Sequence, residues 1–225
     1  MTSIEAPVTV EQRGRVLLAT MDDGRANAMS TAMSGALRAA LARAEQDPGI
    51  GAMVIAGRPG RFSGGFDLGV IRGGDAEAIR EMVDSGGALV AHAYGALVPV
   101  VAACTGHAVA AGALLLLGCD HRVGPDADVK IGLNEVAIGL TLPGWALAIA
   151  AERLSRRHLQ ASVANAQLFD GAGAVGAGFL DAAVEPDAVI EAAVAHASLL
   201  AELDPAAYSA TVQALRGEVL AAMAR

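Results

Sequence analysis

The chain has 225 residues, enough for one large domain, and 54% of them are hydrophobic, a composition that excludes an intrinsically disordered protein. Acidic residues number 24 and basic residues 16, so the formal net charge is −8. This charge argues against nucleic acid or an anionic membrane surface as a partner, because both attract proteins through a basic field.

The N-terminal residues and the cysteines bear on the location of the protein. Residues 1–7 contain neither the basic patch nor the apolar run of a signal peptide, and the apolar segment 108–119 is too short to cross a bilayer. Cys104 and Cys119 both fall in apolar segments without nearby metal-binding partners, so we interpret them as core residues in a reducing compartment. We therefore expect a cytoplasmic protein.

The first part of the chain predicts strands that alternate with helices. Short β-branched runs indicate strands, whereas apolar residues that recur with helical spacing indicate helices. Ser30 is a suitable N-cap, because its hydroxyl can accept a backbone N–H bond. In order, we expect a β-hairpin of residues 8–12 and 15–21, a helix from Ser30 to about residue 47, a buried strand 52–56, a glycine-rich loop 57–68 and a helix 76–96.

The central stretch of the sequence runs from residue 98 to residue 139. Its apolar segment 98–104 predicts a buried strand, which we expect to lead into a short apolar helix, 110–120, that begins with small residues. A ligand oxygen can closely approach the unpaired N–H groups at such a helix N-terminus. Farther along, Glu135 is a lone carboxylate in an apolar segment. An oxyanion site and a base are the two parts needed to form and quench an enolate.

The remaining chain ends in helices alone. In order, we expect strands 121–123 and 129–131, helices 144–154 and 156–165, a strand 179–184, and two helices, 187–203 and 205–225. This order favours a layered α/β core with a helical C-terminal region.

Four motifs resemble those of the crotonase superfamily of enoyl-CoA hydratases and isomerases. They are Asn27-Ala28-Met29-Ser30, the segment 62–68 (Phe-Ser-Gly-Gly-Phe-Asp-Leu), the segment 106–120 from Gly-His-Ala-Val to Cys-Asp, and the segment 134–140 (Asn-Glu-Val-Ala-Ile-Gly-Leu). Each motif alone is weak, but four in this order and spacing are specific. The resemblance covers residues 8–184 and implies the α/β crotonase fold, a superhelix of ββα turns. It also implies a core domain of residues 1–185, a C-terminal helical region of residues 186–225 for capping or trimerisation, and a homotrimer or a hexamer built as a dimer of trimers.

The resemblance implies an oxyanion hole for the thioester of an acyl-CoA substrate. Family members stabilise the enolate with two backbone N–H groups, which by position are those of Phe66 and Ala111. The segment 110–112 (Ala-Ala-Gly) stands where the family often has three glycines, and a methyl group there keeps the N–H but narrows the backbone angles. The matched positions imply further substrate or CoA contacts from Arg25, Asn27, Ala28, Phe62, Gly64, Gly65, Asp67, Leu68, Gly112 and Leu114.

The carboxylates distinguish the reactions of this family. Hydratases of the family hold a water with two glutamates; Glu135 matches the second, whereas Leu114 occupies the place of the first. Leucine cannot orient water, and family isomerases that shift a double bond use one glutamate at the position of Glu135. Isomerisation of an enoyl-CoA is therefore the favoured reaction. Hydration of a 2-enoyl-CoA and non-catalytic acyl-CoA binding are the alternatives.

Several other residues have a structural interpretation beside a functional one. We expect Asp67 to accept backbone N–H bonds in its loop, His107 to be a hydrogen-bonded core residue, and Trp145 to pack against the acyl pocket or a neighbouring subunit. Arg58 and Arg61 flank a loop that the resemblance places near the CoA phosphates. The sequence has no dinucleotide, P-loop or metal-binding motif, so we expect no metal or redox cofactor, and CoA arrives as part of the substrate.

Overall fold

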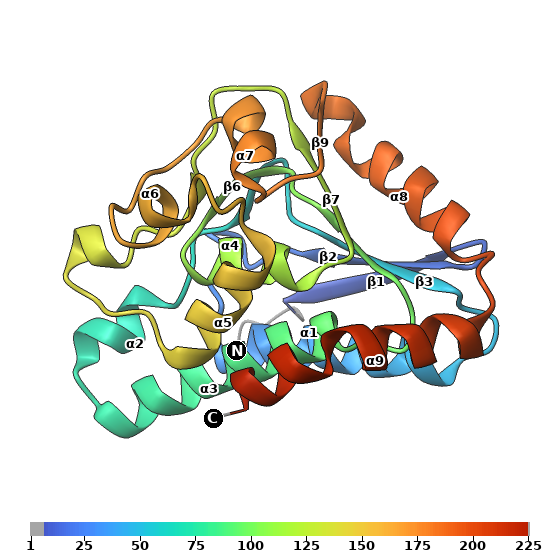
Figure 1. Ribbon diagram of the computed structural model, residues 1–225, viewed down its shortest axis with the longest axis horizontal. Helices are drawn as coiled ribbons and strands as arrows, with labels where there is room; N and C mark the ends of the chain where they lie inside the picture. The colour runs from blue at the N-terminus through green and yellow to red at the C-terminus, as the bar shows by residue number, and fades with distance from the viewer. Residues whose placement is uncertain (1–6, 225) are drawn as a thin grey trace, which may run out of the picture.

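The computed structural model describes residues 7–224, which fold around a large and a small β-sheet (Figure 1). The large sheet has the strand order β1-β2-β3-β5-β7-β9. Strands β1 (Val8–Arg13) and β2 (Val16–Met21) form the predicted antiparallel hairpin. The remaining strands pair in parallel: β3 (Ala52–Ala56), β5 (Val100–Ala103), β7 (His121–Pro125) and β9 (Ala182–Val184).

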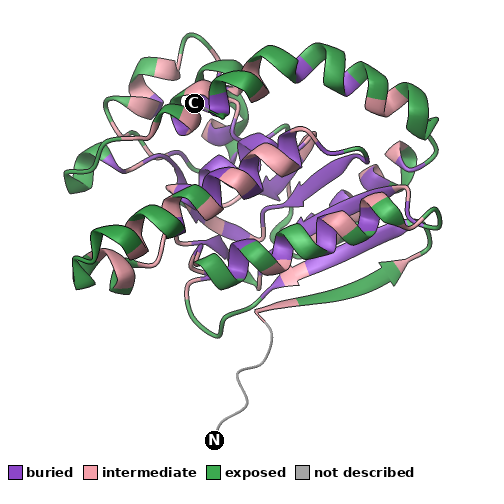
Figure 2. Ribbon diagram, turned by 90° about the horizontal axis from the view of Figure 1, so that it is seen from below, coloured by how far each residue is buried: buried purple, intermediate pink, exposed green. Residues whose placement is uncertain are grey.

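Helices cover both faces of the large sheet, because successive strand residues point to opposite sides. Leu17 and Met53 belong to the main core, whereas Leu18 and Val54 belong to a second apolar cluster with residues of α8. Figure 2 shows that buried residues concentrate in the strands and on the inner sides of the helices, and that the edge strand β1 is mostly exposed. The principal helices are α1 (Thr31–Gln46), α3 (Ala76–Tyr94), α4 (Ala111–Gly118), α5 (Gly144–Arg153), α8 (Val189–Leu200) and α9 (Pro205–Met223).

The small sheet corrects the predicted entry into the central helix. It consists of β4 (Gly60–Ser63), β6 (Gly106–Val109) and β8 (Ile131–Gly132), all parallel. The segment expected as a loop therefore contains β4, and the expected direct passage from the strand at residues 98–104 into the helix is wrong, because β6 intervenes. Such short strands depend on partners that are distant in the chain, and local patterns do not reveal those partners.

Several short helical segments complete the described chain. They are α2 (Leu68–Gly73), α6 (Leu159–Val163), α7 (Gly171–Ala177) and the 3₁₀ turns Val136–Ile138 and Pro186–Ala188. The prediction missed α7 because its glycines are poor helix formers. Its N-terminus is stabilised by Asp170, whose Oδ1 accepts a hydrogen bond from the N–H of Gly173 at 2.7 Å.

The C-terminal helix α9 is anchored to the core of its own chain. Arg216, which is 8% exposed, donates to the carbonyl oxygen of Tyr94 at 2.7 Å and to Oδ1 of Asp120 at 2.6 Å. The hydroxyl of Tyr208 donates to Oδ2 of Asp120 at 3.0 Å. These bonds tie α9 to the end of α3 and to the turn that follows α4. Within residues 7–224, no helix is long and apolar enough to span a membrane.

Candidate active site

A turn after β2 is shaped by one carboxylate. Asp23 accepts hydrogen bonds from the N–H groups of Arg25, Asn27 and Ala28 at 2.7, 2.8 and 2.9 Å. Partial burial acts to raise the pKa of Asp23, but the three N–H groups, together with the nearby charge of Arg58, outweigh it and hold the pKa below its ordinary value. The turn is therefore stabilised around an ionised side chain.

This turn is joined to the glycine-rich segment that follows β4. The N–H of Met29 donates to the carbonyl oxygen of Gly65, and the N–H of Gly64 to that of Ala26, both at 2.8 Å. The hydroxyl of Ser63 donates to the carbonyl oxygen of Asn27 at 2.7 Å. Two segments distant in sequence thus form one continuous wall.

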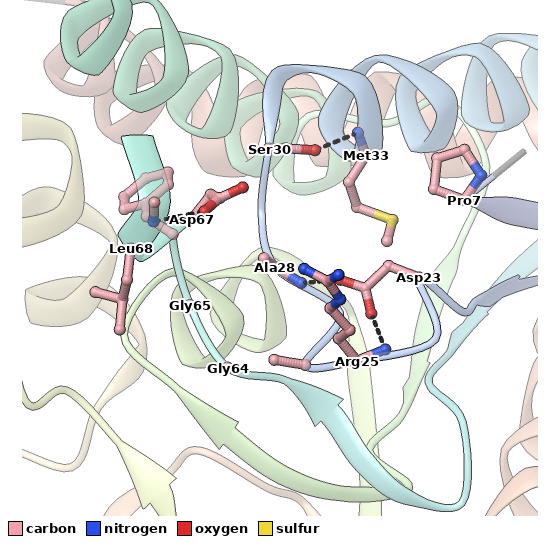
Figure 3. A pocket seen from close by; sticks show the side chains of 13 residues that line it. Pro7, Asp23, Arg25, Ala28, Ser30, Met33, Gly64, Gly65, Asp67 and Leu68 are labelled. Atoms are coloured by element: carbon pink, nitrogen blue, oxygen red, sulfur yellow. Dashed lines mark hydrogen bonds between the residues drawn. The ribbon is translucent and has the colours of Figure 1, made fainter. Parts of the chain in front are cut away.

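The two segments enclose a pocket of about 550 Å³. Figure 3 shows Asp23, Arg25, Ser30 and Met33 around it, with the backbone from Gly64 to Leu68 along one side. Its size falls in the range of small-molecule sites. The predicted residues that line it are Arg25, Ala28, Gly64, Gly65, Phe66, Asp67 and Leu68.

The two predicted oxyanion donors lie where the β4 segment meets the start of α4. A Cβ placed on Gly65 would lie 2.9 Å from Cβ of Ala110 and 3.6 Å from the amide nitrogen of Ala111, so the two backbones are in close contact. Phe66 directly follows Gly65. In the described loops and turns, neither the Phe66 nor the Ala111 N–H donates to another backbone oxygen. Their role as oxyanion donors stays a prediction.

Ala110 adopts a backbone conformation that suits glycine. Its φ of 51° and ψ of −124° lie in a region that a Cβ disfavours. The N–H of Ala110 donates to the carbonyl oxygen of Gly132 at 3.0 Å, which fixes it against β8. The strain is therefore located immediately before the predicted donor Ala111.

Glu135 follows β8 closely and is 7% exposed. Its Oε2 has no hydrogen-bond partner in the described part of the chain. Burial raises the pKa of the Glu135 carboxyl, and the nearby N–H groups of Glu135 and Asn134 lower it by less. Within residues 7–224 the Glu135 side chain makes no helix-capping hydrogen bond and no ion pair, the two structural roles that a carboxylate at this position could have. A buried carboxylate with a free oxygen can act as a general base.

Leu114, at the position of the missing carboxylate, is 1% exposed and lies in the main core. Its burial agrees with the interpretation of this residue as a core or pocket-wall side chain. It has no group that could hold a water.

Two predicted contact residues, Asn27 and Phe62, do not line the pocket. Asn27 is fully buried, and its side-chain amide donates to the carbonyl oxygens of Met21 at 3.0 Å and Phe62 at 3.2 Å. The ring of Phe62 is also fully buried in the main core. Both side chains are committed to internal contacts and do not line the pocket, so a contact of Asn27 or Phe62 with the substrate stays a prediction. Gly112 lies close to Ser63, and a Cβ there would be 2.7 Å from Cβ of Ser63.

The structural interpretations of the other residues can be compared directly with the coordinates. Oδ1 of Asp67 accepts a hydrogen bond from Gly69 N–H at 2.7 Å, as expected. Nδ1 of His107 accepts from Lys130 N–H at 2.9 Å, which confirms a hydrogen-bonded histidine, but the side chain is only half-buried and is not a core residue as expected. Arg58 lies 3.8 Å from Asp22. Arg61 pairs through its backbone with His107 across β4 and β6.

Sequence reasoning missed part of the pocket wall. The residues not predicted are Pro7, Asp23, Ala26, Ser30, Met33 and Gly69. A signal existed for Asp23, because an Asp followed by glycine commonly accepts backbone N–H bonds within a turn. Met33 carried no such signal. Cys104 and Cys119 are free and buried, and the described residues contain no cluster of three or more metal-binding side chains.

Comparison with known proteins identifies the family. The model of the enoyl-CoA hydratase/isomerase family matches residues 11–224, so the chain belongs to this family, within the crotonase superfamily. The solved structure of an enoyl-CoA isomerase of Mycobacterium tuberculosis is 39% identical, with a TM-score of 0.92 over 97% of this chain and 94% of that one. The predicted crotonase fold is thereby confirmed.

Similar proteins carry both reaction names. A probable enoyl-CoA hydratase of Rhizobium meliloti is 30% identical over 89% of this chain and 78% of its own length. The mitochondrial enoyl-CoA delta isomerase 1 of Rattus norvegicus is 28% identical over 81% of this chain and 64% of its own length. This chain is accordingly an enzyme, an enoyl-CoA isomerase or hydratase.

Proposed function

We propose that the protein moves the double bond of a 3-enoyl-CoA to position 2, with Glu135 as its only acid and base. The observation that carries this proposal is the buried carboxyl of Glu135, whose Oε2 has no hydrogen-bond partner among the described residues. Leu114, at the position of the second family carboxylate, is an apolar side chain packed in the core. Moving a double bond requires one group that takes a proton and returns it. Adding water would require a second group to hold the nucleophile.

In the first step, Oε2 of Glu135 takes a proton from C2 of the substrate. The electron pair of the broken C–H bond forms the enolate, and the negative charge on the thioester oxygen is stabilised by the N–H groups of Phe66 and Ala111. Removing one such donor typically costs about 10²–10³ in rate. The protonated Glu135 then delivers the proton to C4, and the double bond ends between C2 and C3. Atoms and charge balance without metal or redox cofactor.

We place the CoA part of the substrate in the pocket around Arg25. Its guanidinium is suited to a phosphate group, and the short side chains of Ala28, Gly64 and Gly65 give access to the main chain. Asp67 and Leu68 complete this wall. In this proposal, CoA enters the reaction only as part of the substrate.

Hydration of a 2-enoyl-CoA is the second candidate. It is supported by the names of similar proteins, among them the hydratase of Rhizobium meliloti. The Glu135→Gln variant tests both reactions, because it preserves shape but removes the base. We expect turnover to fall by about 10²–10⁴ while acyl-CoA binding persists. Undiminished turnover would contradict the role of Glu135, and binding without turnover in the unaltered protein would support a non-catalytic acyl-CoA binder.

We also propose a homotrimer, alone or paired into a hexamer, in the cytoplasm. Four exposed apolar residues in the segment after Glu135 support a subunit interface: Val136, Ile138, Leu140 and Leu147 are 46, 52, 38 and 46% exposed. Two free thiols fit a reducing compartment. In this arrangement residues 1–185 form the core domain, and the C-terminal region of residues 186–225 caps it. Light scattering of the purified protein measures the assembly.

A further inference from the structure

Helix α3 carries two adjacent glycines, each of which receives an aromatic ring. A Cβ on Gly86 would lie 2.6 Å from Cε1 of Phe66, and a Cβ on Gly87 would lie 2.9 Å from both Nε1 and Cε2 of Trp145. Any side chain at either position would displace the ring. The two rings therefore rest directly on one turn of the α3 backbone, Phe66 on one residue and Trp145 on the next.

These two aromatic residues come from the segments that hold the proposed catalytic groups. The backbone N–H of Phe66 is one proposed oxyanion donor. Trp145 begins α5, just after the turn in which the N–H of Leu140 donates to the carbonyl oxygen of Glu135 at 2.9 Å. The ring of Phe66 and the indole of Trp145 thus contact neighbouring residues of α3, which places the indole close to the proposed oxyanion donor.

The indole of Trp145 also lines a cavity of about 560 Å³. One wall is a stripe of α3 that includes Gly87, Ala88 and Ala91. Another part of the wall is the end of α9, with Leu220 and Met223. Apart from Asp84 at its rim, these side chains carry no charge, and the volume lies in the range of small-molecule sites. The cavity is suited to an aliphatic group.

The α9 part of this wall is firmly attached. Helix α9 is held by Arg216, which bonds both Asp120 and the carbonyl oxygen of Tyr94, and Leu220 packs against the position of Gly95. The indole of Trp145 is held differently. Its Nε1 is buried and has no acceptor among the described residues, so packing alone positions the ring. A ring without a hydrogen bond can move aside or be replaced without leaving a new orphaned group.

We infer that the cavity receives the distal end of the acyl chain and that Trp145 is the residue that determines which chain lengths reach it. This inference rests on the proposed function, since it extends the same site. Short chains end before the indole and do not depend on it. Longer chains displace or skirt the ring and bury their last methylenes between α3 and α9. Each methylene buried there contributes about fourfold in affinity.

Trp145 is the only tryptophan of the chain, so its fluorescence reports directly on the cavity. The unaltered protein is titrated with butanoyl-CoA, octanoyl-CoA and dodecanoyl-CoA, and emission is followed together with binding by calorimetry. We expect all three to bind, and only the longer two to shift the emission. Equal emission changes with all three, or none with any of them, would overturn the role of Trp145.

Two variants then test the cavity by opposite changes. Trp145→Ala opens the barrier and should improve dodecanoyl-CoA affinity at least about fivefold relative to butanoyl-CoA. Ala88→Leu fills the cavity and should weaken dodecanoyl-CoA at least about fivefold while butanoyl-CoA stays unchanged. Leu215→Ala is the matched control, because Leu215 lies on α9 but is 74% exposed. Circular dichroism establishes that each variant is folded.

The outcomes separate this inference from the proposed function. If no acyl-CoA binds the unaltered protein, the proposed function fails. If acyl-CoAs bind and the 3-enoyl substrate turns over, but Ala88→Leu leaves the length profile unchanged, the cavity does not hold the chain and this inference alone is overturned.

Discussion

The N–H of Ala110 donates to the carbonyl oxygen of Gly132 at 3.0 Å, and this bond joins the two halves of the proposed catalytic site. Ala110 immediately precedes the amide of Ala111, whereas Gly132 ends the strand that leads to Glu135. The oxyanion donor and the base are therefore positioned by one strand pairing, β6 with β8. A shift of either strand would change the distance between the Ala111 N–H and the Glu135 carboxylate.

Replacing Ala110 by glycine should stabilise the protein by about 1 kcal/mol, because glycine accepts a φ of 51° without strain. Chemical denaturation measures the change in the free energy of unfolding. The matched control is Ala113→Gly, in the buried interior of the same helix. There the substitution should destabilise by about 1 kcal/mol, since the backbone is helical and a methyl group is lost. If both variants lose stability equally, Ala110 is not strained.

Glu135 should make both activity and stability depend on pH. Because burial raises its folded-state pKa, the ionised form destabilises the fold, and stability increases as the pH falls through that raised pKa. Glu135→Gln should therefore be more stable than the unaltered protein at neutral pH, and the difference should vanish near pH 4. The rate should show the opposite trend, rising with pH as the base ionises. Parallel denaturation and rate profiles test this, and a rate independent of pH from 4 to 7 would contradict the assignment.

A stacked histidine pair predicts a second pH effect, away from the site. The rings of His121 on β7 and His196 on α8 are 3.7 Å apart with an interplanar angle of 14°. The pKa of His121 is lowered first by burial, then by the neighbouring His196, and to a smaller degree by Arg122. Asp181, 3.7 Å away, acts to raise this pKa but only partly offsets the lowering.

Because the folded state disfavours the protonated ring, stability should fall as the pH drops below about 6.5. His196→Gln removes one of the two rings and should flatten this pH dependence. Denaturation at pH 5 and at pH 8 compares the two proteins. An unchanged slope between these conditions would show that the stack does not contribute.

Asp23→Ala should loosen the pocket. Its carboxylate accepts three backbone N–H bonds, so its loss should cost about 1–3 kcal/mol and weaken acyl-CoA binding. Asp22→Ala is the control, since Asp22 is exposed like Asp23 but, among the described residues, its carboxylate accepts a backbone bond only from Gly24. Calorimetric titration with acetyl-CoA measures the binding. Equal losses in the two variants would mean that the turn does not depend on Asp23.

Local patterns identified the helices and the large sheet well, because their apolar periodicity is a property of neighbouring residues. The hairpin, the buried strand 52–56 and the cap at Ser30 all appear as expected. The strands β4 and β6 were missed because they exist only through pairing with distant segments. Helix α7 was missed because its stability comes from Asp170 and from packing, against the propensity of its glycines.

Site residues that belong to a sequence motif could be predicted. Site residues that only the folding of distant segments brings to the pocket could not. The sequence indicated the glycine-rich segment, which lines the pocket, and Glu135, which is buried beyond β8. It could not indicate that Met33, from the first helix, lines the pocket, nor that Asn27 turns its amide inward to Met21 and Phe62. A side chain at a position that matches a family motif can stabilise the fold instead of contacting the ligand. Its hydrogen bonds in the structure distinguish these two roles.

The most direct test of the central claim offers the purified protein a 3-enoyl-CoA and a 2-enoyl-CoA in parallel and follows the products by mass and retention time. We predict that the 3-enoyl substrate gives a product of unchanged mass and new retention time, and that the 2-enoyl substrate gains no water. Gain of water by the 2-enoyl substrate would contradict a mechanism that depends on Glu135 alone.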